Sequence, residues 1–155
     1  MLKKLLLFIL VIIVVMQFFP PAENTSDTTP PTDLFKVEKV PETVEATLVT
    51  ACYDCHSNKT NYPWYASIEP LSYWLANHID EGKKHLNFSQ WNSYSPKKKA
   101  HKLEEISEAV TEGWMPLDSY TLIHKEAKLT EAQSKAVADW AQMLHLKYQL
   151  KDLPQ

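Results

Sequence analysis

The chain has 155 residues, of which 45% are hydrophobic and 23% are charged, and its formal net charge is −3. This length provides one compact core of ordinary size and leaves no room for a second. The whole chain has two glycines, so tight hairpin turns are poorly supplied and we expect an all-α domain. The charge balance, which lacks a long basic stripe, argues against nucleic acid as a partner.

Residues 1–20 have the pattern of an export signal. Lys3 and Lys4 precede a nearly unbroken apolar run that ends at Phe19, as in a signal peptide or a signal anchor. The run leaves through Pro20 and Pro21 without a small-x-small cleavage site, which favours an uncleaved anchor in the inner membrane. The two lysines would stay in the cytoplasm, so we expect the rest of the chain on the periplasmic side.

Residues 21–41 are rich in Pro, Thr, Asp and Glu. This composition predicts an extended, mobile tether that buries too little apolar surface to fold. From residue 42 onward the apolar residues recur at helical spacing, and we expect the helical domain to comprise residues 42–155. The predicted helices are residues 42–51, 70–86, 96–113 and one that begins after Thr130.

The first of these helices runs into the sequence Cys52-Tyr53-Asp54-Cys55-His56. Two cysteines separated by two residues and followed by histidine form the attachment signature of haem c. Thiols one helical turn apart can reach the two vinyl groups at one edge of a porphyrin, and the next histidine can coordinate the iron. We therefore expect one covalent haem c, with Cys52 and Cys55 as anchors and His56 as the proximal iron ligand.

Other interpretations of the cysteine pair fit less well. A thioredoxin-like redox pair needs a strand and helix context that this sequence lacks. A structural zinc site normally has four ligands, and no second cysteine or histidine pair occurs at zinc spacing. A stabilising disulfide between Cys52 and Cys55 stays as an alternative in an exported protein.

An electron carrier needs a sixth iron ligand, and Met115 is the best candidate. It lies in Gly113-Trp114-Met115-Pro116, just ahead of the last helix, where proline stiffens the backbone behind the sulfur. His78, on the apolar face of the second predicted helix, and His124 are the other candidates, and an open sixth position is a further alternative.

Aromatic residues after the attachment motif are candidates for the wall of a haem pocket. We expect Trp64 and Tyr65 to contact the cofactor, because Trp and Tyr side chains combine apolar area with a hydrogen-bonding group. Ordinary burial in a small helical core explains such residues equally well.

Several segments resemble those of the bacterial periplasmic haem-binding domain family. They are Cys55-His56-Ser57-Asn58, Tyr62-Pro63-Trp64-Tyr65, residues 85–91, and Met115-Pro116-Leu117 with His124, Leu129 and Thr130. From about Val44 to Leu146 the chain is also similar to class I cytochromes c, including an aromatic residue, Trp140, on the closing helix. The resemblance implies haem binding and an exported location, but no settled reaction.

We expect a membrane-tethered monohaem cytochrome that passes single electrons between redox partner proteins, and so an electron carrier more than a catalyst. An open sixth position would instead indicate a haem-based sensor, a gas-binding domain or a peroxidase-like domain. A third alternative is a binding module in which the haem is structural.

Overall fold

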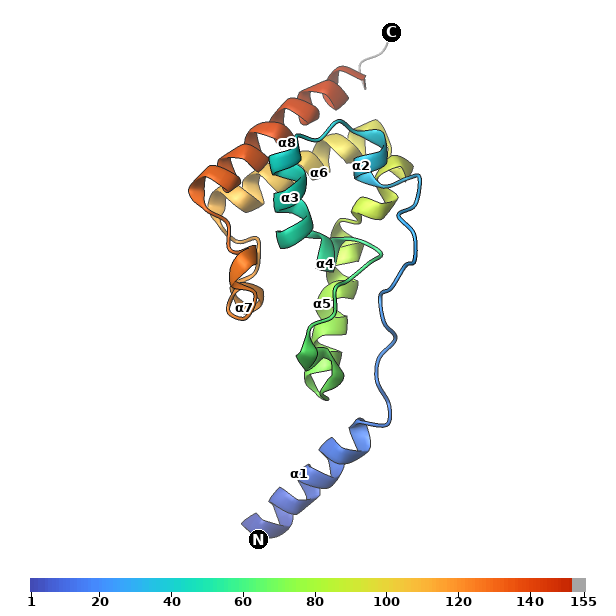
Figure 1. The fold of residues 1–155 in the computed structure, drawn as a ribbon, viewed down its shortest axis with the longest axis vertical. Helices are drawn as coiled ribbons and strands as arrows, with labels where there is room; N and C mark the ends of the chain where they lie inside the picture. Colours follow the sequence, from blue (N-terminus) through green and yellow to red (C-terminus); the bar gives the residue numbers. More distant parts are fainter. Residues whose placement is uncertain (152–155) are drawn as a thin grey trace.

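The computed structural model describes residues 1–151, and this part of the chain is helical without any strand, which confirms the all-α prediction (Figure 1). The longer helices are α1 (Leu2–Met16), α3 (Glu42–Ala51), α5 (Leu71–His85), α6 (Pro96–Glu112) and α8 (Glu131–Lys151). The shorter ones are α2 (Leu34–Val37), α4 (Tyr53–His56), α7 (Asp118–Thr121) and the 3-10 turns η1 (Trp64–Ser67), η2 (Phe88–Ser93) and η3 (Lys125–Ala127).

Local signals set the ends of α6 and α8. The Ser95 side chain accepts a hydrogen bond from the Lys98 amide at the start of α6, and Gly113 ends that helix in the left-handed region with φ 75°. Before α8, the Thr130 hydroxyl accepts from the Gln133 amide while the Gln133 side chain accepts from the Thr130 amide. These are the caps that the sequence predicts.

The core lies where α6 and α8 pack side by side and α3 packs onto α8 (Figure 1). Its fully buried side chains come from all three helices, from α2 and from η2. They include Leu48, Trp91, Leu103, Val137 and Ala141. Outside this core, α4 packs onto α5. The attachment motif therefore lies between the core formed by α3, α6 and α8 and the helix α5.

The last third of the expected tether belongs to the folded domain. Leu34 is fully buried in the core, and Asp33 caps α2 by accepting from the Phe35 amide. The Tyr53 and Ser89 hydroxyls also donate to the Asp33 carboxylate. The polar composition of residues 21–41 as a whole concealed a short apolar cluster that is large enough to anchor the chain on the core.

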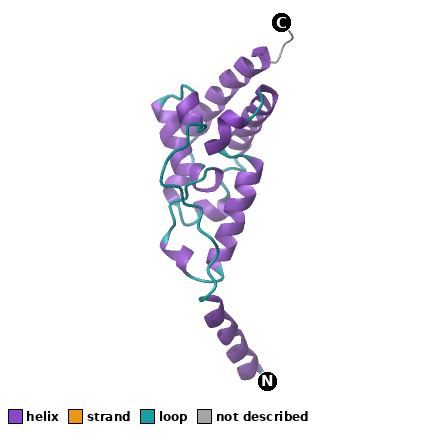
Figure 2. Cartoon of the chain, turned by 90° about the vertical axis from the view of Figure 1, so that its right-hand side faces the viewer, coloured by secondary structure: helices purple, strands orange, loops and turns teal. Residues whose placement is uncertain are grey.

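Helix α1 projects from the body, both in Figure 1 and after the quarter turn of Figure 2. None of its side chains is buried. Among residues 1–151, no helix has the length and apolar character needed to cross a membrane.

Candidate functional site

The attachment motif occupies a break between two helices. α3 ends at Ala51, Cys52 leaves the helical region with φ −128°, and α4 begins at Tyr53. The Cys52 carbonyl accepts hydrogen bonds from the amides of Cys55 at 3.2 Å and His56 at 2.9 Å. One short turn therefore holds both thiols, which are free and half-buried, and the histidine.

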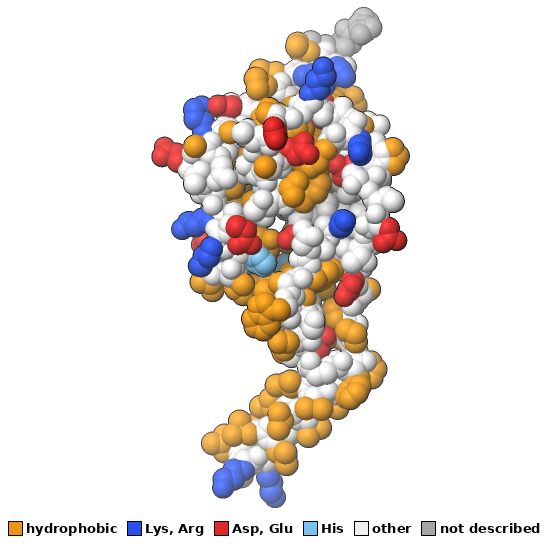
Figure 3. Space-filling model, in the orientation of Figure 1, with side chains coloured by type: hydrophobic (Ala, Val, Ile, Leu, Met, Phe, Trp, Pro, Cys, Tyr) orange, Lys and Arg blue, Asp and Glu red, His pale blue; other side chains and the backbone are white. Residues whose placement is uncertain are grey.

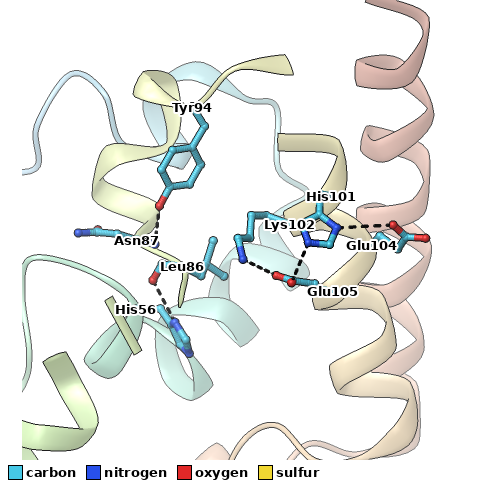
Figure 4. Close-up of polar contacts among 8 residues, drawn as sticks. All are labelled: His56, Leu86, Asn87, Tyr94, His101, Lys102, Glu104 and Glu105. Carbon is cyan, nitrogen blue, oxygen red and sulfur yellow. Dashed lines mark hydrogen bonds and ion pairs between the residues drawn. The ribbon is translucent and has the colours of Figure 1, made fainter. Parts of the chain in front are cut away.

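His56 is oriented by backbone carbonyl groups at the end of α5. Its Nδ1 lies 3.1 Å from the Leu86 carbonyl oxygen (Figure 4). A carbonyl can only accept, so Nδ1 carries the proton and Nε2 keeps its lone pair. Burial lowers the pKa of His56, although the hydrogen bond to Leu86 opposes this. The ring is therefore neutral near pH 7, with a nitrogen ready to bind a metal.

The acceptor of His56 is itself held in place (Figure 4). The Asn87 amide, next to the Leu86 carbonyl, donates to the Tyr94 hydroxyl at 2.9 Å. The Asn87 side chain donates to the Asn58 side chain at 2.9 Å, and both Leu86 and Asn87 are buried. Such outer partners fix the direction of a ligating histidine.

Gly82 on α5 lets the helix approach the attachment motif closely. A Cβ atom at this position would lie 2.6 Å from the Cys55 carbonyl oxygen and 3.2 Å from the carbonyl carbon. Only a residue without a side chain fits between the two backbones. The packing of α5 thus sets the position of Cys55 and of His56 next to it.

The pKa values of the two thiols are shifted in the direction opposite to those of a redox-active pair. Burial, together with the nearby Cys55, raises the pKa of Cys52 to about 12, and burial, together with Asp54, raises that of Cys55 to about 11. Redox-active pairs have lowered thiol pKa values. For zinc, the described residues contain no cluster of three or more His, Cys, Asp or Glu side chains that could hold a metal ion.

The segment that follows Met115 is tied to the attachment motif. Met115 is half-buried, and its amide donates to the Ala109 carbonyl at 3.3 Å. Further on, the Tyr120 hydroxyl on α7 donates to the Asp54 carboxylate at 2.8 Å. Sequence reasoning missed Asp54 and Tyr120; the only signal for Asp54 was its position between the two cysteines.

A second contact joins the segment after α7 to Tyr65, which lies next to the motif. The Tyr65 hydroxyl and His124 Nε2 are 2.9 Å apart, and Tyr65 is buried beside Cys55 in a small apolar cluster. His124 Nδ1 lies 3.3 Å from a Glu126 carboxylate oxygen. Both ring nitrogens of His124 are thus engaged within the protein.

The remaining candidates lie farther out. Trp64 is 76% exposed and meets the Tyr65 ring edge-on. His78 is half-buried, and its Nδ1 donates to the Trp74 carbonyl at 2.8 Å. The structure brings Cys52, Cys55 and His56 together with Tyr65, whereas the Trp64 side chain points to solvent.

Among known proteins, the chain matches the haem-binding domain family over residues 11–143. No curated protein and no solved structure matches it. The matched range begins within α1 and includes the linker, the attachment motif and the segment around Met115.

Proposed function

The chain belongs to the haem-binding domain family, and from this premise we propose that it is an exported c-type cytochrome with one covalent haem c. It passes single electrons between redox partner proteins at the periplasmic side of the inner membrane, to which residues 1–20 attach it. Haem supplies one-electron chemistry through its iron. The observation that carries the proposal is His56, whose Nδ1 donates to Leu86 and leaves Nε2 for the iron.

Each residue of the motif has its own part in holding the haem. Cys52 and Cys55 would hold the haem through thioether bonds, each formed by addition of an S–H group across a vinyl double bond, which needs no oxidant. His56 would bind the haem iron, which supplies the one-electron chemistry. The free, protonated thiols and the neutral imidazole are the forms that these roles require.

We assign the sixth ligand to Met115. Its segment is tied to the attachment motif by the hydrogen bond from Tyr120 to Asp54. His124 is occupied by Tyr65 and Glu126, which argues against it as a ligand. A methionine sulfur at the sixth position raises the reduction potential and keeps small external ligands away from the iron, as an electron carrier requires.

Covalent attachment is tested by denaturation. The full chain is produced together with haem maturation machinery, unfolded in detergent and separated from free haem. We expect the haem absorbance to stay with the polypeptide and to be lost in the Cys52→Ser, Cys55→Ser double variant. A wild-type chain that releases its haem on denaturation would disprove covalent binding.

Carbon monoxide distinguishes the carrier from a sensor or gas-binding domain. We expect the reduced wild-type protein to bind carbon monoxide poorly and the Met115→Ala variant to bind it readily. Met143→Ala is the matched control, because Met143 is 65% exposed on α8. Rapid binding by the wild type, unchanged in Met115→Ala, would favour an open sixth position.

A further inference from the structure

An apolar surface lies where the body of the protein meets α1, with the exposed carboxylate of Glu23 beside it. Residues 62–79 contain a single Asp, Glu, Lys or Arg, namely Glu69, and Glu69 is buried. Figure 3 shows hydrophobic side chains at this end of the body and along α1. The exposed apolar and aromatic side chains of this surface, each at least 40% exposed, are Phe18, Phe19, Trp64, Ile68, Leu71, Tyr73 and Trp74.

Hydrogen bonds join this apolar surface to the end of α1. The Gln17 side chain donates to the Glu69 carbonyl and accepts from the Glu69 amide, both at 3.2 Å. The Tyr73 hydroxyl donates to the Phe19 carbonyl. The apolar helix and the apolar surface are therefore neighbours with a defined relative position.

The beginning of the tether is also hydrogen-bonded to the body, close to the attachment motif. The Asn24 amide donates to the Tyr62 hydroxyl at 2.5 Å, and the Asn24 side chain donates to the Ser57 carbonyl at 2.9 Å. The Thr60 amide in turn donates to the Asn24 carbonyl at 3.0 Å. The tether thus runs along the body, and hydrogen bonds of Asn24 hold it there directly beside the attachment motif.

A lipid bilayer fits this surface better than a protein does. The 15 residues of α1 span roughly 22 Å at 1.5 Å per residue. This is less than the ~30 Å of a bilayer core, so a bilayer that receives α1 is brought close to the body of the protein. Trp and Tyr side chains prefer the level of the lipid headgroups. A redox partner that docks through complementary charges would find little charge here to recognise, since the exposed carboxylate beside this surface is that of Glu23.

We propose that this apolar surface rests on the bilayer that receives α1 and so fixes the orientation of the haem domain at the membrane. The proposal rests on the membrane attachment by residues 1–20 proposed above. α5 begins at this surface and rises from Leu71 to Gly82, which contacts Cys55. Eleven residues of helix span about 16 Å, so the attachment motif is held at a set height above the lipid.

Spin labels test the contact with lipid in the full-length holoprotein, where haem occupies the native cysteines. Labels are placed at Ile68→Cys and Leu71→Cys, and at Met143→Cys on α8 as the control; all three positions are exposed. The protein is reconstituted into vesicles of phosphatidylethanolamine and phosphatidylglycerol. We expect labels 68 and 71 to become accessible to oxygen and protected from a water-soluble nickel relaxant, while label 143 stays accessible to nickel.

Three outcomes would overturn the proposal. Labels 68 and 71 that stay as accessible to nickel as label 143, in protein that sediments with the vesicles, would exclude lipid contact. Label–label broadening with loss of access to both relaxants would indicate a second copy of the chain. Protein that does not sediment with vesicles would refute membrane attachment itself. Covalent haem absorbance of the same samples shows separately whether the proposed haem attachment holds.

Discussion

Replacing Gly82 by alanine has two opposing effects on stability: a gain in helix propensity and a steric clash with the attachment motif. In the interior of α5, alanine is favoured over glycine by about 1 kcal/mol. The new Cβ, however, would lie 2.6 Å from the Cys55 carbonyl oxygen, whereas ordinary contacts begin at 3.4 Å. The motif must therefore move by about 0.8 Å, and such overpacking costs about 1–3 kcal/mol.

The same displacement affects the histidine. If His56 moves with Cys55 away from α5, its 3.1 Å hydrogen bond to Leu86 lengthens to about 3.9 Å, which is no longer a hydrogen bond. We therefore expect Gly82→Ala to lose stability, by up to about 2 kcal/mol after the propensity gain, and to change the haem spectrum and reduction potential.

The assay is thermal unfolding of the holoprotein combined with optical spectra and redox titration. Gly113→Ala is the matched control: nothing lies within 4 Å of its added Cβ, but its φ of +75° makes alanine strained. The control should lose about 1 kcal/mol, and it is compared by Tm alone because Gly113 lies two residues before Met115. A Gly82→Ala protein with a raised Tm and a wild-type spectrum would refute the close approach of α5 to the motif.

Three further predictions concern the loop, acid stability and the thiols. Tyr120→Phe removes the hydrogen bond to the Asp54 carboxylate, which is worth about 1.5–3 kcal/mol. The reduced Tyr120→Phe variant should therefore bind carbon monoxide faster than the reduced Tyr73→Phe control. Equal rates in the two variants would contradict the role of this contact. Burial would raise the pKa of Glu38, but hydrogen bonds from Lys147, Tyr148 and Trp91 lower it below 4.5. The resulting stability is present above pH 4.5 and lost as the pH falls through the lowered pKa, so acid unfolding should be less steep in Glu38→Gln, and an unchanged slope would exclude this carboxylate. Folded haem-free protein should react slowly with iodoacetamide at pH 8, because the raised thiol pKa values leave thiolate fractions of only about 10⁻³ or less, unlike the protein in urea.

The sequence predicts the helices well where local signals are strong. Ser95 with Gly113 and Thr130 with Gln133 mark the ends of α6 and α8, because caps act through neighbouring backbone groups. The Cys-x-x-Cys-His motif is also visible in five consecutive residues, and its role in attaching haem stays a prediction. Leu34 was missed because its burial depends on a distant core surface, and no local pattern in a polar segment reveals that.

The partners of the motif could not be predicted for the same reason. Leu86 lies 30 positions after His56 and acts through its carbonyl, a group that every residue has. Tyr120 and Asp54 are 66 positions apart. Gly82 could have been noticed as one of only two glycines, since a glycine inside a helix costs stability and needs a reason.

The contacts that hold His56 differ in kind from those that hold the segment after Met115. His56 lies in α4, Gly82 lies in α5 and Leu86 directly follows α5, so the surroundings of His56 belong to the packed body. The segment after Met115 is held to the motif by side-chain hydrogen bonds, from Tyr120 to Asp54 and between Tyr65 and His124. A hydrogen bond to a charged group contributes about 1.5–3 kcal/mol. Its loss would lower the ratio of bound to released forms of the segment after Met115 by roughly 10- to 150-fold. We therefore predict that variants in the segment after Met115 keep their haem, while their iron becomes more accessible to ligands when the contacts of Tyr120 or His124 are removed.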